Sequence, residues 1–117
     1  MFGLFRRKDP LKERSDATRA ALAARGDDGT RPAPVEHRFA AEGGGAVNAT
    51  VVTDYLVASG LETRQTAEDR ILAVETREVA SEAFDARVAA LARAVEGWRW
   101  RHDGWDRPGA NETGESR

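Results

Sequence analysis

The sequence predicts an α+β fold of the ferredoxin-like type, in which a four-stranded antiparallel sheet carries two helices on one face and an extra helix precedes them. The main observation is the order of apolar patterns, which reads strand, helix, strand, strand, helix, strand after a first helical segment. Glycines end several of these segments. Right-handed crossovers then place both central helices on the same face, and they give the strand order 4-1-3-2.

The chain is expected to form one domain over residues 15–106 with a disordered tail at each end. Its 117 residues and mass of 12.8 kDa suit a single domain. Residues 1–14 begin with a short apolar run followed by cations, which is too short to anchor the chain to a membrane. Residues 107–117 contain no large apolar side chain.

The first helix is expected over residues 15–25, with Ser15 or Asp16 as its N-cap and Gly26 just after its end. Its apolar residues are mostly alanine, so it should pack at the periphery. A turn-forming stretch rich in Gly, Asp and Pro follows. Residues 35–39 then alternate between apolar and polar side chains, which predicts the first strand.

The second helix is expected over residues 46–59, where apolar residues recur at helical spacing until Gly60. Residues 61–66 alternate weakly and are rich in threonine, which is typical of an exposed edge strand. Residues 70–78 hold a run of β-branched and leucine side chains, so they are expected to form a central strand.

The clearest amphipathic helix lies between Ser81, its expected N-cap, and Gly97, which ends it. Its apolar positions are Phe84, Val88, Leu91, Ala92 and Val95. Residues 98–103 then alternate between aromatic and charged side chains. This pattern predicts the last strand, after which Gly104 and Trp105 should turn away from the sheet.

The composition excludes several classes of protein. The chain has 18 Lys and Arg against 20 Asp and Glu, and this net charge of −2 argues against a dedicated nucleic-acid-binding protein. The absence of cysteine excludes disulfides, Cys-ligated zinc, iron–sulfur clusters and thiol nucleophiles. No apolar run approaches the roughly 20 residues that span a bilayer, so we expect a cytoplasmic protein.

The sequence offers no catalytic constellation. The three glycines at residues 43–45 lack the Gly-Lys-Ser/Thr ending of a phosphate-binding loop, which favours a flexible connection. His37 and His102 lie on strands expected to be neighbours, but two ligands do not make a zinc site, and Asp103 should point to the opposite face from His102. We therefore expect no enzyme activity, no metal site and no cofactor.

The most unusual stretch is residues 98–105, which holds all three tryptophans. Two interpretations remain open: Trp98 and Trp100 fill the core under the helices, or the strand forms a partner surface with Arg99 and Arg101 exposed on the open sheet face. Gly104 and Trp105 also have a structural interpretation, as a residue with positive φ and a plug at the end of the core. The predicted partner-binding residues are Trp98, Arg99, Trp100, Arg101, His102, Asp103, Gly104 and Trp105.

Three stretches within residues 16–106 resemble the regulator of ribonuclease E activity B family, whose members are small bacterial inhibitors of an RNA-degrading endonuclease. They are Arg25-Gly26-Asp27-Asp28 followed by Val35-Glu36-His37-Arg38-Phe39, then Val57-Ala58-Ser59-Gly60-Leu61-Glu62-Thr63, and finally Phe84-Asp85-Ala86-Arg87 with His102-Asp103-Gly104-Trp105-Asp106. The chain departs from the family at His102, where the family has Tyr, and just before it, where the family has a Gly-Gly pair.

This resemblance implies a non-enzymatic regulator that acts on an RNA-decay nuclease by protein–protein contact. One alternative is an RNA-binding domain that uses the open sheet face, although residues 70–78 contain no aromatic side chain for base stacking. A homodimer through the same face, or a domain with an unidentified small ligand, also remains open.

Overall fold

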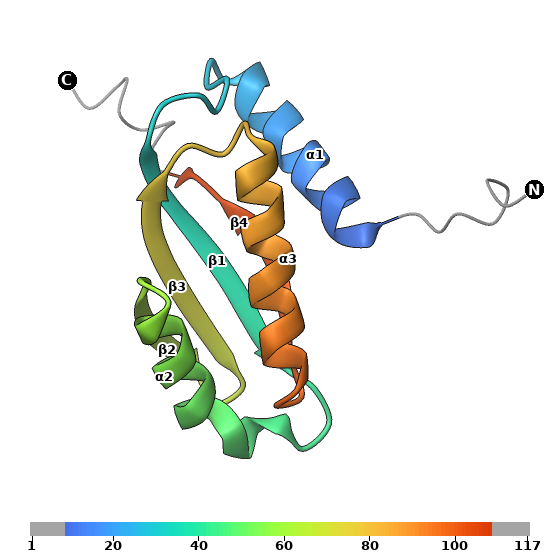
Figure 1. The fold of residues 1–117 in the computed structure, drawn as a ribbon, viewed down its shortest axis with the longest axis vertical. Helices are drawn as coiled ribbons and strands as arrows, with labels where there is room; N and C mark the ends of the chain where they lie inside the picture. Colours follow the sequence, from blue (N-terminus) through green and yellow to red (C-terminus); the bar gives the residue numbers. More distant parts are fainter. Residues whose placement is uncertain (1–8, 109–117) are drawn as a thin grey trace, which may run out of the picture.

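The computed structural model, which describes residues 9–108, confirms the α+β fold (Figure 1). The elements are α1 (Pro10–Ala24), β1 (Ala33–Ala41), the 3₁₀ helix η2 (Gly45–Asn48), α2 (Ala49–Ala58), β2 (Glu62–Ala67), β3 (Arg70–Arg77), α3 (Glu82–Glu96) and β4 (Trp100–Asp106). The sheet is antiparallel in the order β2-β3-β1-β4, which is the expected order read from the other edge. Helices α2 and α3 cover one face, and α1 packs beside α3 near β4.

The N-terminal helix starts earlier than the sequence analysis predicted. The side chain of Asp9 accepts hydrogen bonds from the backbone N–H groups of Leu11 and Lys12, and Pro10 occupies the first helical position. Ser15 and Asp16, the two expected N-caps, both lie inside the helix instead, and Ser15 is buried there. The expectation of a disordered tail over residues 1–14 is therefore wrong for residues 9–14, while residues 1–8 lie outside the described part of the chain.

The last strand is also displaced, because it begins at Trp100 and continues through Gly104 and Trp105. The register between β1 and β4 shifts beside Arg38, so that β4 carries one extra residue at this point. Gly104 accommodates this bulge with a φ of 109°. The shift puts Trp105 opposite His37 on the helix-covered face, so the expectation that Gly104 and Trp105 turn away from the sheet is wrong.

The core consists of two clusters under the helices. The larger cluster packs the sheet against α2 and the second half of α3, and its main members are Phe39, Val52, Leu56, Ile71, Leu91, Val95 and Trp100. The smaller cluster joins α1 to the first half of α3, and its members are Leu22, Val35, Val79, Phe84, Val88 and Trp105. The rings of His37 and His102 lie between Phe39 of the larger cluster and Phe84 of the smaller one.

Candidate partner-binding surface

The structure divides the predicted partner-binding residues into a buried group and an exposed group. Trp100, His102, Gly104 and Trp105 are buried, so they cannot contact a partner in this conformation. Trp98 and Asp103 are half-buried, whereas Arg99 and Arg101 are exposed. The eight residues therefore do not form one continuous surface. The reason is the alternation of β4, which turns its aromatic residues toward the helices.

The buried tryptophans are explained by the fold. The Trp100 indole N–H donates to the Gly45 carbonyl oxygen at 2.6 Å. The Trp105 indole N–H donates to the Ser15 hydroxyl at 2.9 Å, and its ring meets Phe84 edge-on at 4.8 Å. Both rings thus have apolar packing and a satisfied donor. Trp100 therefore fills the core as one interpretation expected, Trp105 plugs the end of the core, and Trp98 is only half-buried.

His37 and His102 do approach each other, and their hydrogen bonds assign their tautomers. The Gly104 N–H donates to His102 Nδ1 at 3.2 Å, so the neutral His102 ring carries its proton on Nε2. His102 Nε2–H then donates to His37 Nδ1 at 3.0 Å. His37 Nε2–H in turn donates to Glu75 at 2.8 Å. Every ring nitrogen has a partner, which explains both histidines as buried structural groups.

Burial and charge shift the pKa values in this network. Desolvation lowers the pKa of His102 to about 3, with His37, Arg14 and Arg38 adding to the effect. Burial on its own would raise the pKa of Glu75, but hydrogen bonds from His37 and Arg87 outweigh it and lower that pKa to about 2. The network therefore holds a neutral His102 ring close to the ionised Glu75 carboxylate. Within residues 9–108, no group of three or more potential metal ligands occurs.

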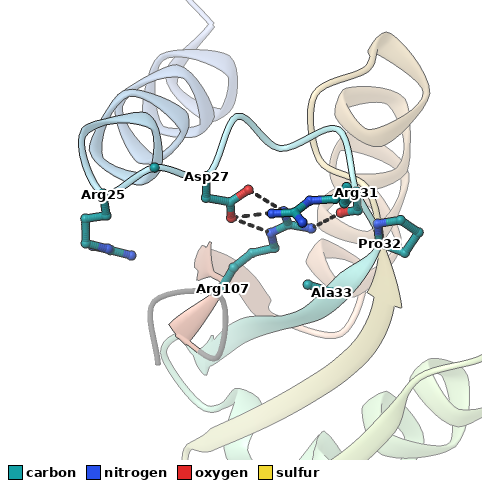
Figure 2. Close-up of a pocket in the computed structure, with 7 residues that line it drawn as sticks. Arg25, Asp27, Arg31, Pro32, Ala33 and Arg107 are labelled. Carbon is teal, nitrogen blue, oxygen red and sulfur yellow. Dashed lines mark hydrogen bonds and ion pairs between the residues drawn. The ribbon is translucent and has the colours of Figure 1, made fainter. Parts of the chain in front are cut away.

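A second buried polar pair lies beside a cavity of about 190 Å³ at the end of α1 (Figure 2). Arg107 forms a bidentate ion pair with Asp27, with a shortest distance of 2.7 Å. Its remaining N–H groups donate to the backbone carbonyl oxygens of Arg31 and Arg77. Since all five guanidinium donors are used within the fold, this pair is structural.

This pair also corrects the tail prediction. Residues 107–117 were expected to be disordered, but Arg107 is only 1% exposed. Residues 109–117 lie outside the described part of the chain. The pairing also gives a structural role to Asp27, one of the residues that carry the family resemblance.

The exposed residues at the start of β4 lie next to an apolar helix face. We call Val47, Val51, Tyr55, Trp98 and Arg99 the β4 corner. The Tyr55 and Trp98 rings are 5.8 Å apart, and the Asn48 side chain donates to the Trp98 carbonyl oxygen at 2.9 Å. Val47, Val51 and Tyr55 are spaced by four residues along η2 and α2, so they share one face. Val47 is 87% exposed and Val51 37%.

Arg99 has an unusual backbone conformation at this corner. It has a φ of 68°, and among residues 9–108 it is the non-glycine residue with positive φ. The Glu42 N–H donates to the Arg99 carbonyl oxygen, and a Cβ on Gly45 would overlap that same oxygen. The close packing of this loop, rather than flexibility, thus explains the glycine at position 45.

Sequence analysis did not identify the helical part of this corner. It placed Val47 and Val51 in the apolar pattern of the second helix and did not distinguish an exposed side of that helix from a buried one. In the structure the buried side is formed by Ala49, Val52 and Leu56. The available signal was the four-residue spacing of Val47, Val51 and Tyr55, which sets them on a different side of the helix from Val52 and Leu56.

The open sheet face carries charged residues without aromatic rings. Its charged side chains are Glu36, Arg38, Glu62, Arg64, Arg70, Arg101, Asp103 and Asp106. Arg101 lies within 3.4 Å of Glu42 and 3.3 Å of Asp103. Arg99 precedes the strand and belongs to the turn after α3, so its expected pairing with Arg101 on this face is wrong.

No protein-family model and no curated protein matches this chain. Among the described residues, no helix is long and apolar enough to cross a membrane. The geometry of the described residues therefore provides the basis for a functional proposal.

Proposed function

We propose that the chain is a cytoplasmic, non-enzymatic regulatory domain that acts by binding another protein through the β4 corner. The proposed partner is an RNA-degrading endonuclease, as the resemblance to the regulator of ribonuclease E activity B family implies. The observation that carries the proposal is Arg99, an exposed arginine with positive φ that directly follows Trp98, whose half-buried ring packs on Tyr55.

The chemistry of the corner fits a protein contact. Tryptophan and arginine are enriched at the energetic centres of protein interfaces, where apolar neighbours exclude water. Here Trp98 is half-buried against Tyr55, while Val47 and Val51 extend the apolar area. Arg99 makes no ion pair with any residue in the described range, so its guanidinium is available to hydrogen-bond a partner.

The buried polar groups support binding rather than catalysis. The His37–His102–Glu75 network and the Asp27–Arg107 pair are satisfied by partners inside the fold. Among residues 9–108, no buried side-chain nitrogen or oxygen lacks a hydrogen-bond partner. A substrate would have to displace one of these internal partners in order to reach a reactive group.

Arg99→Gly tests the corner without damaging the fold. Glycine adopts positive φ freely, so this variant should unfold at the same temperature as the wild type or slightly higher. We expect it to bind the RNA-decay endonuclease of the same organism about tenfold more weakly by calorimetry, a loss of about 1.4 kcal/mol. Inhibition of RNA cleavage should weaken in parallel.

Arg64→Ala is the matched control, because Arg64 is an exposed arginine on β2, away from the corner, with no ion pair in the described range. It should bind the endonuclease as tightly as the wild type. Wild-type affinity in the Arg99→Gly variant would exclude the corner as the contact surface.

The RNA-binding alternative has a separate test. The open sheet face has no exposed ring on which a base could stack, and its arginines are interspersed with carboxylates. We expect no salt-dependent binding when single-stranded RNA is titrated at 50 mM salt. Binding with a clear salt slope would favour the RNA interpretation instead.

A further inference from the structure

We propose that a groove between α1 and β4 binds an extended acidic segment of a partner protein. This groove, which we call the α1–β4 groove, has a volume of about 340 Å³. Its wall on α1 includes Arg14, Ala17, Ala21 and Arg25, and its wall on the sheet includes Arg38 and Asp106. It lies toward the end of β4, whereas the β4 corner lies at the start of that strand.

Three arginines in this groove have no carboxylate partner. Arg14, Arg25 and Arg38 form no ion pair with any residue between 9 and 108. Several other arginines of the chain form ion pairs with carboxylates, for example Arg19 with Asp85 and Arg87 with Glu75.

The groove holds three arginines against one carboxylate. The chain has more acidic than basic residues, so a cluster of unpaired cations is not explained by its composition. Asp106 is the acidic residue in the lining, and its carboxylate accepts a hydrogen bond from the backbone N–H of Arg107 at 2.8 Å. The groove is therefore positively charged and suits an anionic ligand.

The spacing of the arginines favours an elongated ligand. Arg14 and Arg25 are eleven residues apart, which puts them on the same helix face and about 16 Å apart along the axis. That distance corresponds to about five residues of extended chain. Ala17 and Ala21 lie between them and leave room for a backbone to approach.

The sheet side of the groove adds a second reason for an extended segment. Strand β4 pairs only with β1 in the described sheet, so one of its edges has no partner strand. An extended peptide can add to such an edge through main-chain hydrogen bonds. The Arg38 side chain also reaches this strand. Its guanidinium lies next to the backbone of Gly104, in the space that a side chain at position 104 would occupy.

The aromatic content of the groove distinguishes a peptide from a nucleic acid. Trp105 is the aromatic residue in the lining, but it is only 2% exposed and its indole N–H is bonded to Ser15. A nucleic-acid strand would have no ring on which to stack its bases. An acidic peptide needs only the cations and the free edge.

The test uses the full chain and a fluorescein-labelled octapeptide of alternating Glu and Thr, with binding followed by fluorescence anisotropy at 50 and 150 mM salt. We expect Arg14→Gln/Arg25→Gln to weaken binding about tenfold or more. The control Arg64→Gln/Arg93→Gln removes the same charge from two exposed arginines on β2 and α3. It should weaken binding less than about twofold, and a Lys-Thr octapeptide should not bind.

Three outcomes would overturn the proposal. They are no binding of the acidic octapeptide, an equal loss in both double variants, or tighter binding of a single-stranded RNA octamer that is lost in Arg14→Gln/Arg25→Gln. Arg99→Gly should leave octapeptide binding unchanged. Failure of this proposal is therefore distinguishable from failure of the β4 corner as the endonuclease contact.

Discussion

The histidine pair cannot accept a proton without losing a hydrogen bond. A proton on His102 Nδ1 would face the Gly104 N–H, which already donates to that nitrogen. A proton on His37 Nδ1 would face the Nε2–H of His102. The His102 ring would then have to carry its proton on Nδ1, where it would face the N–H of Gly104. The backbone geometry of the β4 bulge and the neutral state of His102 therefore depend on each other.

We expect stability to fall as the pH is lowered below about 6.5. The pKa of His102 is about 3 in the folded chain, against an ordinary value of 6.5, so the unfolded chain binds the proton first. The free energy of unfolding should drop by up to about 1.4 kcal/mol per pH unit between pH 6.5 and 5. Denaturant titrations followed by tryptophan fluorescence at pH 7.5, 6 and 5 measure this loss.

His102→Gln is the control, because it keeps an N–H donor toward His37 but removes one titrating site. Its loss over the same pH range should be smaller, and an unchanged slope would exclude His102 as the cause. The stabilisation from Glu75 is lost at lower pH, as the pH falls from 4.5, the ordinary pKa of Glu75, toward about 2, its pKa in the folded chain.

The Asp27–Arg107 pair joins several elements at one end of the molecule. It connects the loop after α1 to the residue that follows β4, and Arg107 also bonds the carbonyl oxygen at the end of β3. Desolvation alone would raise the pKa of Asp27, but hydrogen bonding to Arg107 prevails and lowers it. The pair thus fixes a loop that contains little regular structure.

Arg107→Ala should destabilise the fold by about 3–5 kcal/mol, because it leaves the Asp27 carboxylate without its buried counter-charge. Arg107→Lys should restore only part of this loss, since an ammonium offers three donors where the guanidinium uses five. Urea unfolding measures both variants. Arg31→Ala is the control, because Arg31 has an exposed side chain in the same loop, and it should change stability by less than about 0.5 kcal/mol. An equally small effect of Arg107→Ala would contradict the structural role of the pair.

Helix α1 belongs to the same cooperative unit as the sheet. Leu22 is 1% exposed and packs in the smaller cluster, and Ser15 holds the Trp105 indole. The histidine pair links this cluster to the larger one. The whole described chain should therefore unfold in one transition.

Leu22→Ala should lower the free energy of unfolding by about 2–5 kcal/mol. Circular dichroism reports all helices, and tryptophan fluorescence reports mainly the packing of β4, so both probes should shift to the same new midpoint. Two separate midpoints would show that α1 unfolds independently. Leu11→Ala, at a half-buried position of the same helix, should cause a smaller loss.

The sequence was sufficient for the order of the helices and strands and for the sheet topology. Alternation in residues 35–39 and the apolar spacing after Ser81 are local patterns, and the chirality of crossovers then leaves few arrangements. The same reasoning placed His37 and His102 on neighbouring strands, as the structure has them. It failed at the first helix because Asp9 and Pro10 are a stronger start signal than Ser15.

The candidate site depended on tertiary contacts. One extra residue in β4 reverses the faces of all side chains after it, so strict alternation could not place Trp105. Arg107 is buried because it meets Asp27, which is 80 positions away in the chain. Periodicity reports which residues share a face of one element. Which faces are covered, and which arginines have no ion pair among the described residues, depends on contacts between elements, and only the tertiary structure shows these contacts.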